Sequence, residues 1–244
     1  MRETVLVLMV KRPLPGQGKQ RLTPVLGEKG AEKIAQALLA CALEDCQSWP
    51  GPVTVSPACP EDAGWASKLL PQAWVIPQIG GGLGERLNAI DRILRDRGSR
   101  RIVFMGCDAP GLSEPDFSGI RMALIERDMV ISPASDGGAV LLGSRCPWPD
   151  LGLLPWSTPA LYQTLVRLCQ DAGRTVASLR RGFDVDHPED LATAYSALEG
   201  DPRPARRAFR SLVGRFLEST ESSLWGKFEK TASGNGKGSG EEGR

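Results

Sequence analysis

A cluster of cationic side chains lies in residues 11–22, whose sequence is KRPLPGQGKQRL. The cations are Lys11, Arg12, Lys19 and Arg21, and no acidic residue occurs from Thr4 to Gly27. Cations without neighbouring acids can bind phosphate through charge-assisted hydrogen bonds, and Gly16 lets a ligand approach the backbone. We therefore interpret this segment as an anion site, with a solvated basic surface loop as the alternative.

The spacing of these residues excludes the two common phosphate-binding motifs. A P-loop needs glycine where Pro13 stands and serine or threonine where Gln20 stands. The dinucleotide fingerprint needs a third glycine after Gly16 and Gly18, and the sequence lacks it. A phosphate bound here would need a loop of a different kind.

Three aspartates could supply carboxylate chemistry: Asp108 and Asp136 follow predicted strands, and Asp186 alternates with Asp184 along an extended segment. Asp108 ends the run IVFMGCD, Asp136 precedes two glycines in SPASDGG, and Asp186 lies in FDVDHPEDL. Mg²⁺ takes such oxygen ligands, often one or two carboxylates together with substrate phosphates. Each aspartate has a structural alternative, because Asp108 and Asp136 suit turns and Asp186 suits the cap of the following helix.

A glycine-rich loop, QIGGGLGERL at residues 78–87, runs into another predicted helix. The N-terminus of a helix presents free N–H groups to an anion, and Arg86 adds a cation there. The alternative is a plain flexible connection.

Apolar runs and helical periodicities alternate along the chain and predict the frame that carries these residues. Strands are expected at residues 4–10, 53–56, 73–77, 101–106, 129–132 and 138–143. Helices are expected at residues 31–46, 83–98, 114–128, 158–173 and 188–200. This order predicts an α/β domain with a mainly parallel sheet between two layers of helices. Ligands bind such sheets at the carboxyl ends of strands, where the basic segment and Asp108 fall.

The composition restricts the class of protein. The chain has 244 residues and a net charge of +1, so no global charge draws it to nucleic acid or to a membrane. No apolar run approaches the ~18 residues of a spanning helix. The cysteines form no CxxC pair and His187 is the single histidine, so a zinc site is not expected. Cysteines scattered in this way are typical of unpaired thiols in a protein of a reducing compartment. We expect a cytoplasmic protein without nucleic-acid partners.

The character of the sequence changes near residue 200. We expect a domain at residues 1–200, an appended basic amphipathic helix at 201–220, and disorder at 221–244, where glycine, serine, lysine and glutamate dominate. We expect the appended helix to pack at the edge of the domain, and the alternative is contact with a membrane or an acidic partner.

The segments above, in their order, resemble the GT-A nucleotidyl/glycosyltransferase superfamily, in particular its CofC-like and MobA-like bacterial "transferase 1" branch. The resemblance is carried by Lys11-x-Pro13-x-Pro15-Gly16-x-x-Lys19-Gln20-Arg21-Leu22, Gln78-x-Gly80-Gly81-x-Leu83-Gly84-x-Arg86, Gly106-x-Asp108-x-Pro110, Pro133-x-x-Asp136-Gly137-Gly138, Trp156-Ser157-Thr158 and Asp184-x-Asp186-His187-Pro188-Glu189-Asp190-Leu191. It implies a single GT-A-like domain of three layers with a mixed, mainly parallel sheet.

The resemblance also implies roles for individual residues. The nucleotide-binding residues would be Lys11, Gly16, Lys19, Arg21, Gln78, Gly81 and Arg86. Lys19 and Asp108 would act in catalysis, and Asp108 and Asp186 would bind Mg²⁺ or Mn²⁺. Asp136, Gly137 and Trp156 would face the acceptor. The chain departs from the family pattern at Gln20 and His187, where threonine is usual, and it lacks the aromatic residue often found after Asp-Gly-Gly.

These features predict a metal-dependent transferase that uses a nucleotide donor and a small-molecule acceptor. Both nucleotidyl transfer and glycosyl transfer are open at this point. The alternative is an inactive nucleotide-binding module that acts through its C-terminal helix.

Overall fold

A seven-stranded sheet in the order β3-β2-β1-β4-β6-β5-β7 forms the centre of the molecule. The computed structural model describes the backbone of residues 3–233 and the side chains of residues 3–218. The strands are β1 (Thr4–Val10), β2 (Val53–Pro57), β3 (Trp74–Val75), β4 (Arg101–Met105), β5 (Met129–Pro133), β6 (Ala139–Ser144) and β7 (Val176–Ser178). Strand β6 is antiparallel to β4 and β5, and the other paired strands are parallel. The predicted mixed, mainly parallel sheet is therefore confirmed.

Helices cover both faces of the sheet because its central strands are apolar on both sides. In β1, Leu6 and Leu8 pack against helices α1 (Thr23–Ser48), α2 (Ala63–Ala66) and α4 (Glu114–Glu126). Val5 and Val7 alternate with them and pack against α3 (Leu83–Asp96) and α5 (Leu161–Asp171) on the other face. This alternation is what a strand buried on both faces requires.

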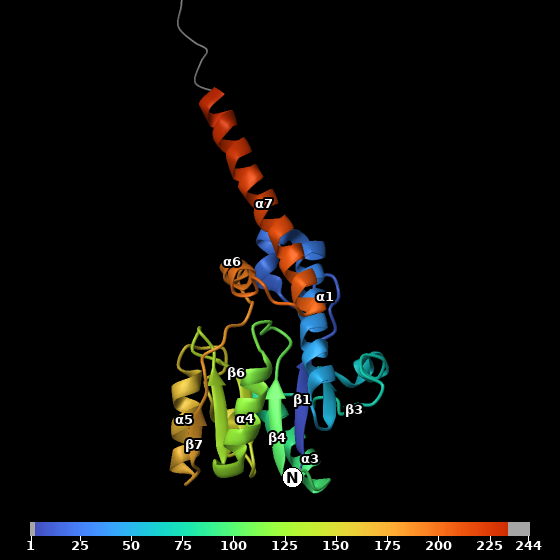
Figure 1. Cartoon of the computed structure of the whole chain (residues 1–244), viewed down its shortest axis with the longest axis vertical. Coiled ribbons are helices and arrows are strands. Elements are labelled where there is room, and N and C mark those ends of the chain that lie inside the picture. The colour runs from blue at the N-terminus through green and yellow to red at the C-terminus, as the bar shows by residue number, and fades with distance from the viewer. Residues whose placement is uncertain (1–2, 234–244) are drawn as a thin grey trace, which may run out of the picture.

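A third apolar cluster joins α1 to the two last helices, α6 (Pro188–Ala197) and α7 (Pro204–Ser233). Phe209 and Val213 of α7 are fully buried in it. Figure 1 shows α6 and α7 gathered beside α1 beyond one end of the sheet, with α7 extending away from the domain. The first half of α7 is therefore packed against the domain, as expected for a helix at its edge.

Several boundaries differ from the sequence-based expectations. Helix α1 starts earlier than expected, at Thr23, with a break at Gly27, whose φ is 67°. Strand β7 was not predicted because three residues carry too little periodicity to be recognised. Helix α7 continues to Ser233, where disorder was expected from residue 221. The expectation for residues 234–244 concerns residues outside the described part of the chain.

Candidate active site

The predicted site residues come from loops that leave the sheet at one edge. Residues 11–22 follow β1, and Gly106–Pro110 follow β4, which pairs with β1 in parallel. The Asp184–Asp186 segment follows β7 and is joined to the β4 loop by a backbone hydrogen bond from Val185 N to Asp108 O, 2.9 Å long. This bond explains how residues far apart in the sequence come together.

Lys19 is held between Asp108 and Asp186. Its Nζ donates to Asp186 Oδ1 at 2.6 Å and to Asp108 Oδ2 at 3.4 Å. These two distances add up to 6.0 Å, which is the largest separation that the two oxygens can have. The Lys19 side chain is only 12% exposed, so the three charged groups form one partly desolvated cluster.

Charge, more than burial, sets the ionisation of this cluster. Burial lowers the pKa of Lys19, but the charges of Asp108 and Asp186 outweigh it, so the pKa of the ammonium lies above its usual value. Burial raises the pKa of Asp186, and the Lys19 ammonium more than offsets that effect, so the pKa of this carboxyl is lowered. Both groups are charged at neutral pH.

Local structure aims the basic loop at this cluster. Lys19 has a left-handed backbone (φ 43°, ψ 35°) and precedes a 3₁₀ turn, η1 (Gln20–Leu22). Arg21 lies beyond it, with Nη1 3.8 Å from Asp186 Oδ2 and 3.1 Å from His187 Nε2. His187, and not Asp186, is the N-cap residue of α6, so the capping alternative for Asp186 is wrong.

The capping of α6 is accomplished by another carboxylate. Asp190 accepts hydrogen bonds from the backbone N–H groups of Asp186 (2.9 Å) and His187 (2.6 Å). The Asp186 side chain therefore remains available to Lys19.

A cavity of about 220 Å³ opens beside these charges. Asp108, Asp136, Asp184 and Asp186 line one part of it. Its other walls are mainly apolar and include Met9, Leu83, Leu87, Phe104, Leu142, Trp156 and Leu161. A small molecule with an apolar body and polar groups at one end would fit such a lining.

Asp184 also lines the cavity, although the sequence analysis does not predict it as a site residue. The pKa of Asp184 is raised to about 6, mainly by burial and further by the negative charges of Asp108, Asp136 and Asp186. The available signal was its alternation with Asp186 in FDVD, since residues two apart on an extended segment share a face.

Asp136 and Trp156, two of the three predicted acceptor residues, line the same cavity, and Gly137 adjoins it in the sequence without lining it. Asp136 Oδ1 accepts a hydrogen bond from Gly138 N at 2.8 Å, so it shapes the β5–β6 turn and also lines the cavity. Gly137 has φ 91°, and a Cβ there would lie 2.2 Å from Pro159 O, so only glycine fits. The Trp156 indole donates to Leu151 O at 2.8 Å, which holds its ring at the cavity wall.

The glycine-rich loop follows β3 and does not contribute Gln78, Gly81 or Arg86 to the cavity. Gln78 is buried and donates to Ser56 O at 2.8 Å, while Arg86 Nε donates to Gly81 O at 2.8 Å. Arg86 Nη1 and Gln78 Oε1 are 3.5 Å apart. Leu83 and Leu87, in the helix that follows the loop, do line the cavity.

Two further members of the predicted nucleotide site, Lys11 and Gly16, also lie outside the lysine–aspartate cluster. Lys11 is exposed, and so is Gly16, whose carbonyl accepts a hydrogen bond from the Gln20 side chain at 3.3 Å. Arg12 turns elsewhere, with Nη1 3.5 Å from Asp62 and its guanidinium 5.8 Å from the ring centre of Trp65.

Asp108 and Asp186 offer carboxylate oxygens of the kind that a divalent cation binds. Within residues 3–218, no group of three or more acidic, histidine or cysteine side chains is arranged to hold a metal ion. Asp108 and Asp186, however, already enclose a cation, the Lys19 ammonium. Two carboxylates completed by substrate phosphates are a common Mg²⁺ site, so this pair fits such an ion.

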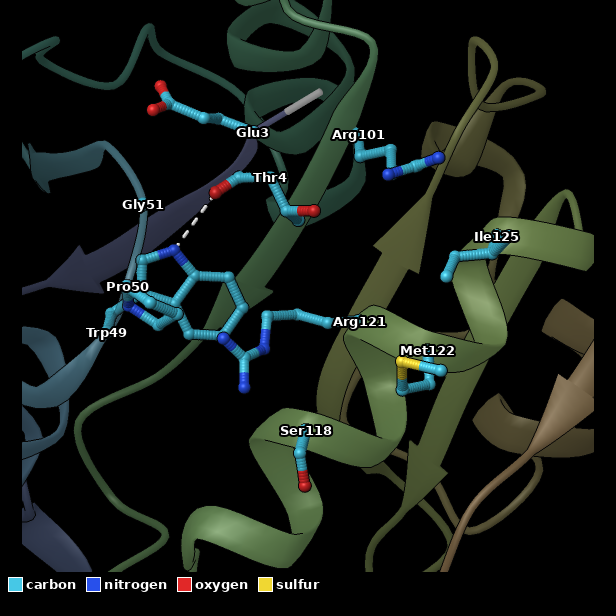
Figure 2. Close-up of a pocket in the computed structure, with 10 residues that line it drawn as sticks. All are labelled: Glu3, Thr4, Trp49, Pro50, Gly51, Arg101, Ser118, Arg121, Met122 and Ile125. Atoms are coloured by element: carbon cyan, nitrogen blue, oxygen red, sulfur yellow. Dashed lines mark hydrogen bonds between the residues drawn. The ribbon is translucent and has the colours of Figure 1, made fainter. Parts of the chain in front are cut away.

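A larger hollow, of about 310 Å³, lies at the opposite edge of the sheet, where β1 and β4 begin. Figure 2 shows Trp49 on one side of it and Met122 and Ile125 of α4 on the other. The Arg121 guanidinium lies 5.3 Å from the Trp49 ring centre and pairs with Glu114 at 3.0 Å. None of the sequence-predicted site residues lines this hollow, so we place the candidate active site at the other edge.

No helix in the described part of the chain is long and apolar enough to cross a membrane.

Comparison with solved structures supports the fold assignment. A crystal structure from Desulfovibrio desulfuricans G20, provisionally described as a nucleotide-diphospho-sugar transferase, is 27% identical with a TM-score of 0.78, covering 88% of this chain and 99% of that one. A homologue of a Mycobacterium tuberculosis protein, from Mycobacterium sp. strain JC1, is 20% identical with a TM-score of 0.51, covering 82% and 99%. The bifunctional IspDF of Campylobacter jejuni is 12% identical with a TM-score of 0.51, covering 78% and 53%. The last two show a shared fold alone.

Sequence comparison gives one family. No curated protein matches the chain. The model of the family DUF2064, described as "Uncharacterized protein conserved in bacteria", matches residues 39–158, which include the glycine-rich loop, Asp108 and Asp136. The chain thus matches the DUF2064 family over these residues and has the fold of a nucleotide-diphospho-sugar transferase.

Proposed function

We propose that this chain is a metal-dependent enzyme that transfers a nucleotidyl or glycosyl group from a nucleotide donor to a small acceptor. The observation that carries the proposal is the meeting of Lys19, Asp108 and Asp186 beside a cavity at the carboxyl ends of the strands. The fold shared with the Desulfovibrio protein, at 27% identity, supports the nucleotide donor.

The donor's phosphates would lie against the basic loop. Lys19 and Arg21 lie beside Asp186, which lines the cavity, and Lys11 and Gly16 lie at exposed positions of the same loop. Cations fixed before the reaction stabilise charge that develops on phosphate oxygens. The Gln78–Arg86 loop, with Gly81, would hold the rest of the nucleotide.

Asp108 and Asp186 would hold Mg²⁺ or Mn²⁺ together with the donor's phosphates. When bound, such an ion offsets charge on the phosphoryl oxygens and orients the leaving group. The two carboxylates themselves would fix the position of the donor relative to the cavity.

The acceptor would occupy the cavity, with its apolar part against Trp156 and its reactive hydroxyl near Asp136 and Asp108. In nucleotidyl transfer the acceptor oxygen bonds to the α-phosphorus and pyrophosphate leaves. In glycosyl transfer it bonds to the anomeric carbon and a nucleoside diphosphate leaves. In both reactions the hydroxyl proton passes to a carboxylate of the cavity or to water.

Titration calorimetry of the full chain with each nucleoside triphosphate and a panel of nucleotide-sugars, all with Mg²⁺, tests the donor. We expect one nucleotide to bind in the micromolar range or tighter. Product analysis with that donor and a library of small alcohols then separates the two reactions, because one releases pyrophosphate and the other a nucleoside diphosphate. Asp108→Asn should bind nucleotide yet lose turnover. Absence of binding by every nucleotide would refute the proposal.

An inactive nucleotide-binding module remains the competing function, and the length of α7 beyond the domain favours it. Binding of nucleotide without product from any acceptor, in the wild type and in Asp108→Asn alike, would support this second function.

A further inference from the structure

We infer that Lys19 and the metal ion compete for the same two carboxylates, so the metal enters the site only together with the nucleotide. This inference rests on the proposed function, since it assumes that Asp108 and Asp186 are metal ligands. It adds an order of events, in which the donor's phosphates take over the Lys19 ammonium and thereby free the carboxylates.

The first step of the argument is that Lys19 already satisfies both carboxylates. Its Nζ is 2.6 Å from Asp186 Oδ1 and 3.4 Å from Asp108 Oδ2. The carboxylates are 40% and 38% exposed, whereas the lysine side chain is 12% exposed. The ammonium therefore occupies the inner side of the pair and neutralises part of its charge.

The second step is that ammonium and metal cannot share these oxygens. A divalent cation binds carboxylate oxygens at roughly 2.0–2.6 Å. An ammonium 2.6 Å from the same Asp186 oxygen would then lie within a few ångströms of a doubly charged ion. Repulsion between like charges at that range is strong in a partly buried site. One of the two cations must leave.

The third step is where Lys19 goes. A phosphate group offers the ammonium an acceptor of equal or higher charge, and lysine carries its charge on a flexible stem of four carbons. The backbone of Lys19 is already in the left-handed region at φ 43°, a conformation that costs energy for a residue with a side chain. We expect this strained loop to change when the nucleotide arrives.

The test measures binding of Mn²⁺ alone, without nucleotide, to the full chain by electron paramagnetic resonance. Lys19→Met removes the competing charge and should bind Mn²⁺ about tenfold tighter than the wild type. Lys11→Met is the matched control, because it changes the net charge equally on the same loop at an exposed position. It should change Mn²⁺ affinity by less than about threefold. Lys19→Met combined with Asp186→Asn should lose the gain.

Three results would overturn the inference: no gain for Lys19→Met, including undetectable binding; an equal gain for Lys11→Met; or a gain that survives Asp186→Asn. Lys19→Gln serves as a second variant, and thermal melts verify that each variant is folded. Nucleotide titration of the wild type distinguishes the two proposals. If the wild type binds no nucleotide, the proposed function is rejected. The competition between Lys19 and the metal is decided separately, by the Mn²⁺ affinities measured without nucleotide.

Discussion

The site concentrates backbone strain as well as charge at single residues. Within the described residues, Lys19 (φ 43°) and Ser157 (φ 62°) are the residues other than glycine that have positive φ. Lys19 contacts the two aspartates, and Ser157 lines the adjacent cavity. Such strain persists where the surrounding structure enforces it, and it often marks functional sites. Both observations point to the same edge of the sheet.

At the residue scale, Lys19→Ala or Arg21→Ala should weaken nucleotide binding by roughly tenfold to a hundredfold. Under the proposed function, each variant removes a cation that would donate a charge-assisted hydrogen bond to a phosphate of the donor. Titration calorimetry with nucleotide and Mg²⁺ measures the effect.

Arg12→Ala is the internal control, because Arg12 pairs with Asp62 and stacks over Trp65 and so points away from the lysine–aspartate cluster. It should cost much less affinity. Unchanged nucleotide affinity in both Lys19→Ala and Arg21→Ala would mean that residues 11–22 form a solvated basic surface loop and not an anion site.

At the scale of elements, the packing of α3 on the 3₁₀ helix η3 (Leu151–Leu153) depends on Gly84. A Cβ at Gly84 would lie 2.0 Å from Leu151 O. The same carbonyl accepts the hydrogen bond from the Trp156 indole. Gly84→Ala should therefore lower the free energy of unfolding by about 1–3 kcal/mol, as overpacking does, and should disturb the cavity wall.

Chemical denaturation measures this loss of stability. Gly80→Ala, in the loop just before α3, is the matched control, because no heavy atom lies within 4 Å of its added Cβ. Equal stability of the two variants would mean that α3 and η3 separate at little cost.

A second prediction for elements concerns the edge strand β7. Asp128 precedes β5 and accepts hydrogen bonds from Thr175 N (2.9 Å) and Thr175 Oγ1 (2.8 Å), next to β7. These backbone and side-chain hydrogen bonds, helped by Arg145, lower the pKa of Asp128 to about 2 from 3.8. A lowered pKa means that the charged carboxylate stabilises the fold above about pH 4, and that this contribution disappears as the pH falls toward 2.

Asp128→Asn imitates the protonated carboxyl, so it should melt a few degrees below the wild type at pH 7 and approach it at pH 2. Differential scanning calorimetry across this range measures the gap. Glu126→Gln, at an exposed carboxylate nearby, should show no comparable gap at pH 7. A gap for Asp128→Asn that stays constant with pH would contradict the assignment.

At the scale of the whole molecule, Arg206 joins α7 to the rest of the domain. Its side chain is fully buried and pairs with Asp45 and Glu44 of α1. It also donates to Pro110 O at 3.2 Å, in the loop that carries Asp108. The buried part of α7 is therefore tied both to the core and to the candidate site.

Arg206→Met should lower the free energy of unfolding by about 3 kcal/mol, because among the described residues it leaves buried Asp45 with Arg203 as its remaining ion-pair partner. Arg207→Met, at the neighbouring exposed position, should change it by less than about 0.5 kcal/mol. Urea denaturation of the two variants tests this. Similar stabilities would mean that α7 contributes little to the fold, as an appendage would.

Several features of the protein follow from its sequence alone, because they depend on neighbouring residues. The run at 4–10 specifies a strand buried on both faces, and periodicity specifies α3 and α4 to within two residues at their ends. The sequence marks Asp108 because it directly follows a predicted strand, and Asp186 because it alternates with Asp184 along an extended segment. The fold class follows from the order of such elements.

Other features were decided only by the tertiary structure, because they depend on residues distant in sequence. The meeting of Lys19 with Asp108 and Asp186 needs the pairing of β1 with β4 and the bond from Val185 to the Asp108 loop. Burial of Arg206 depends on the acidic partners that α1 presents to α7. Long-range contacts of this kind leave no local pattern, since each side chain alone resembles an ordinary surface charge.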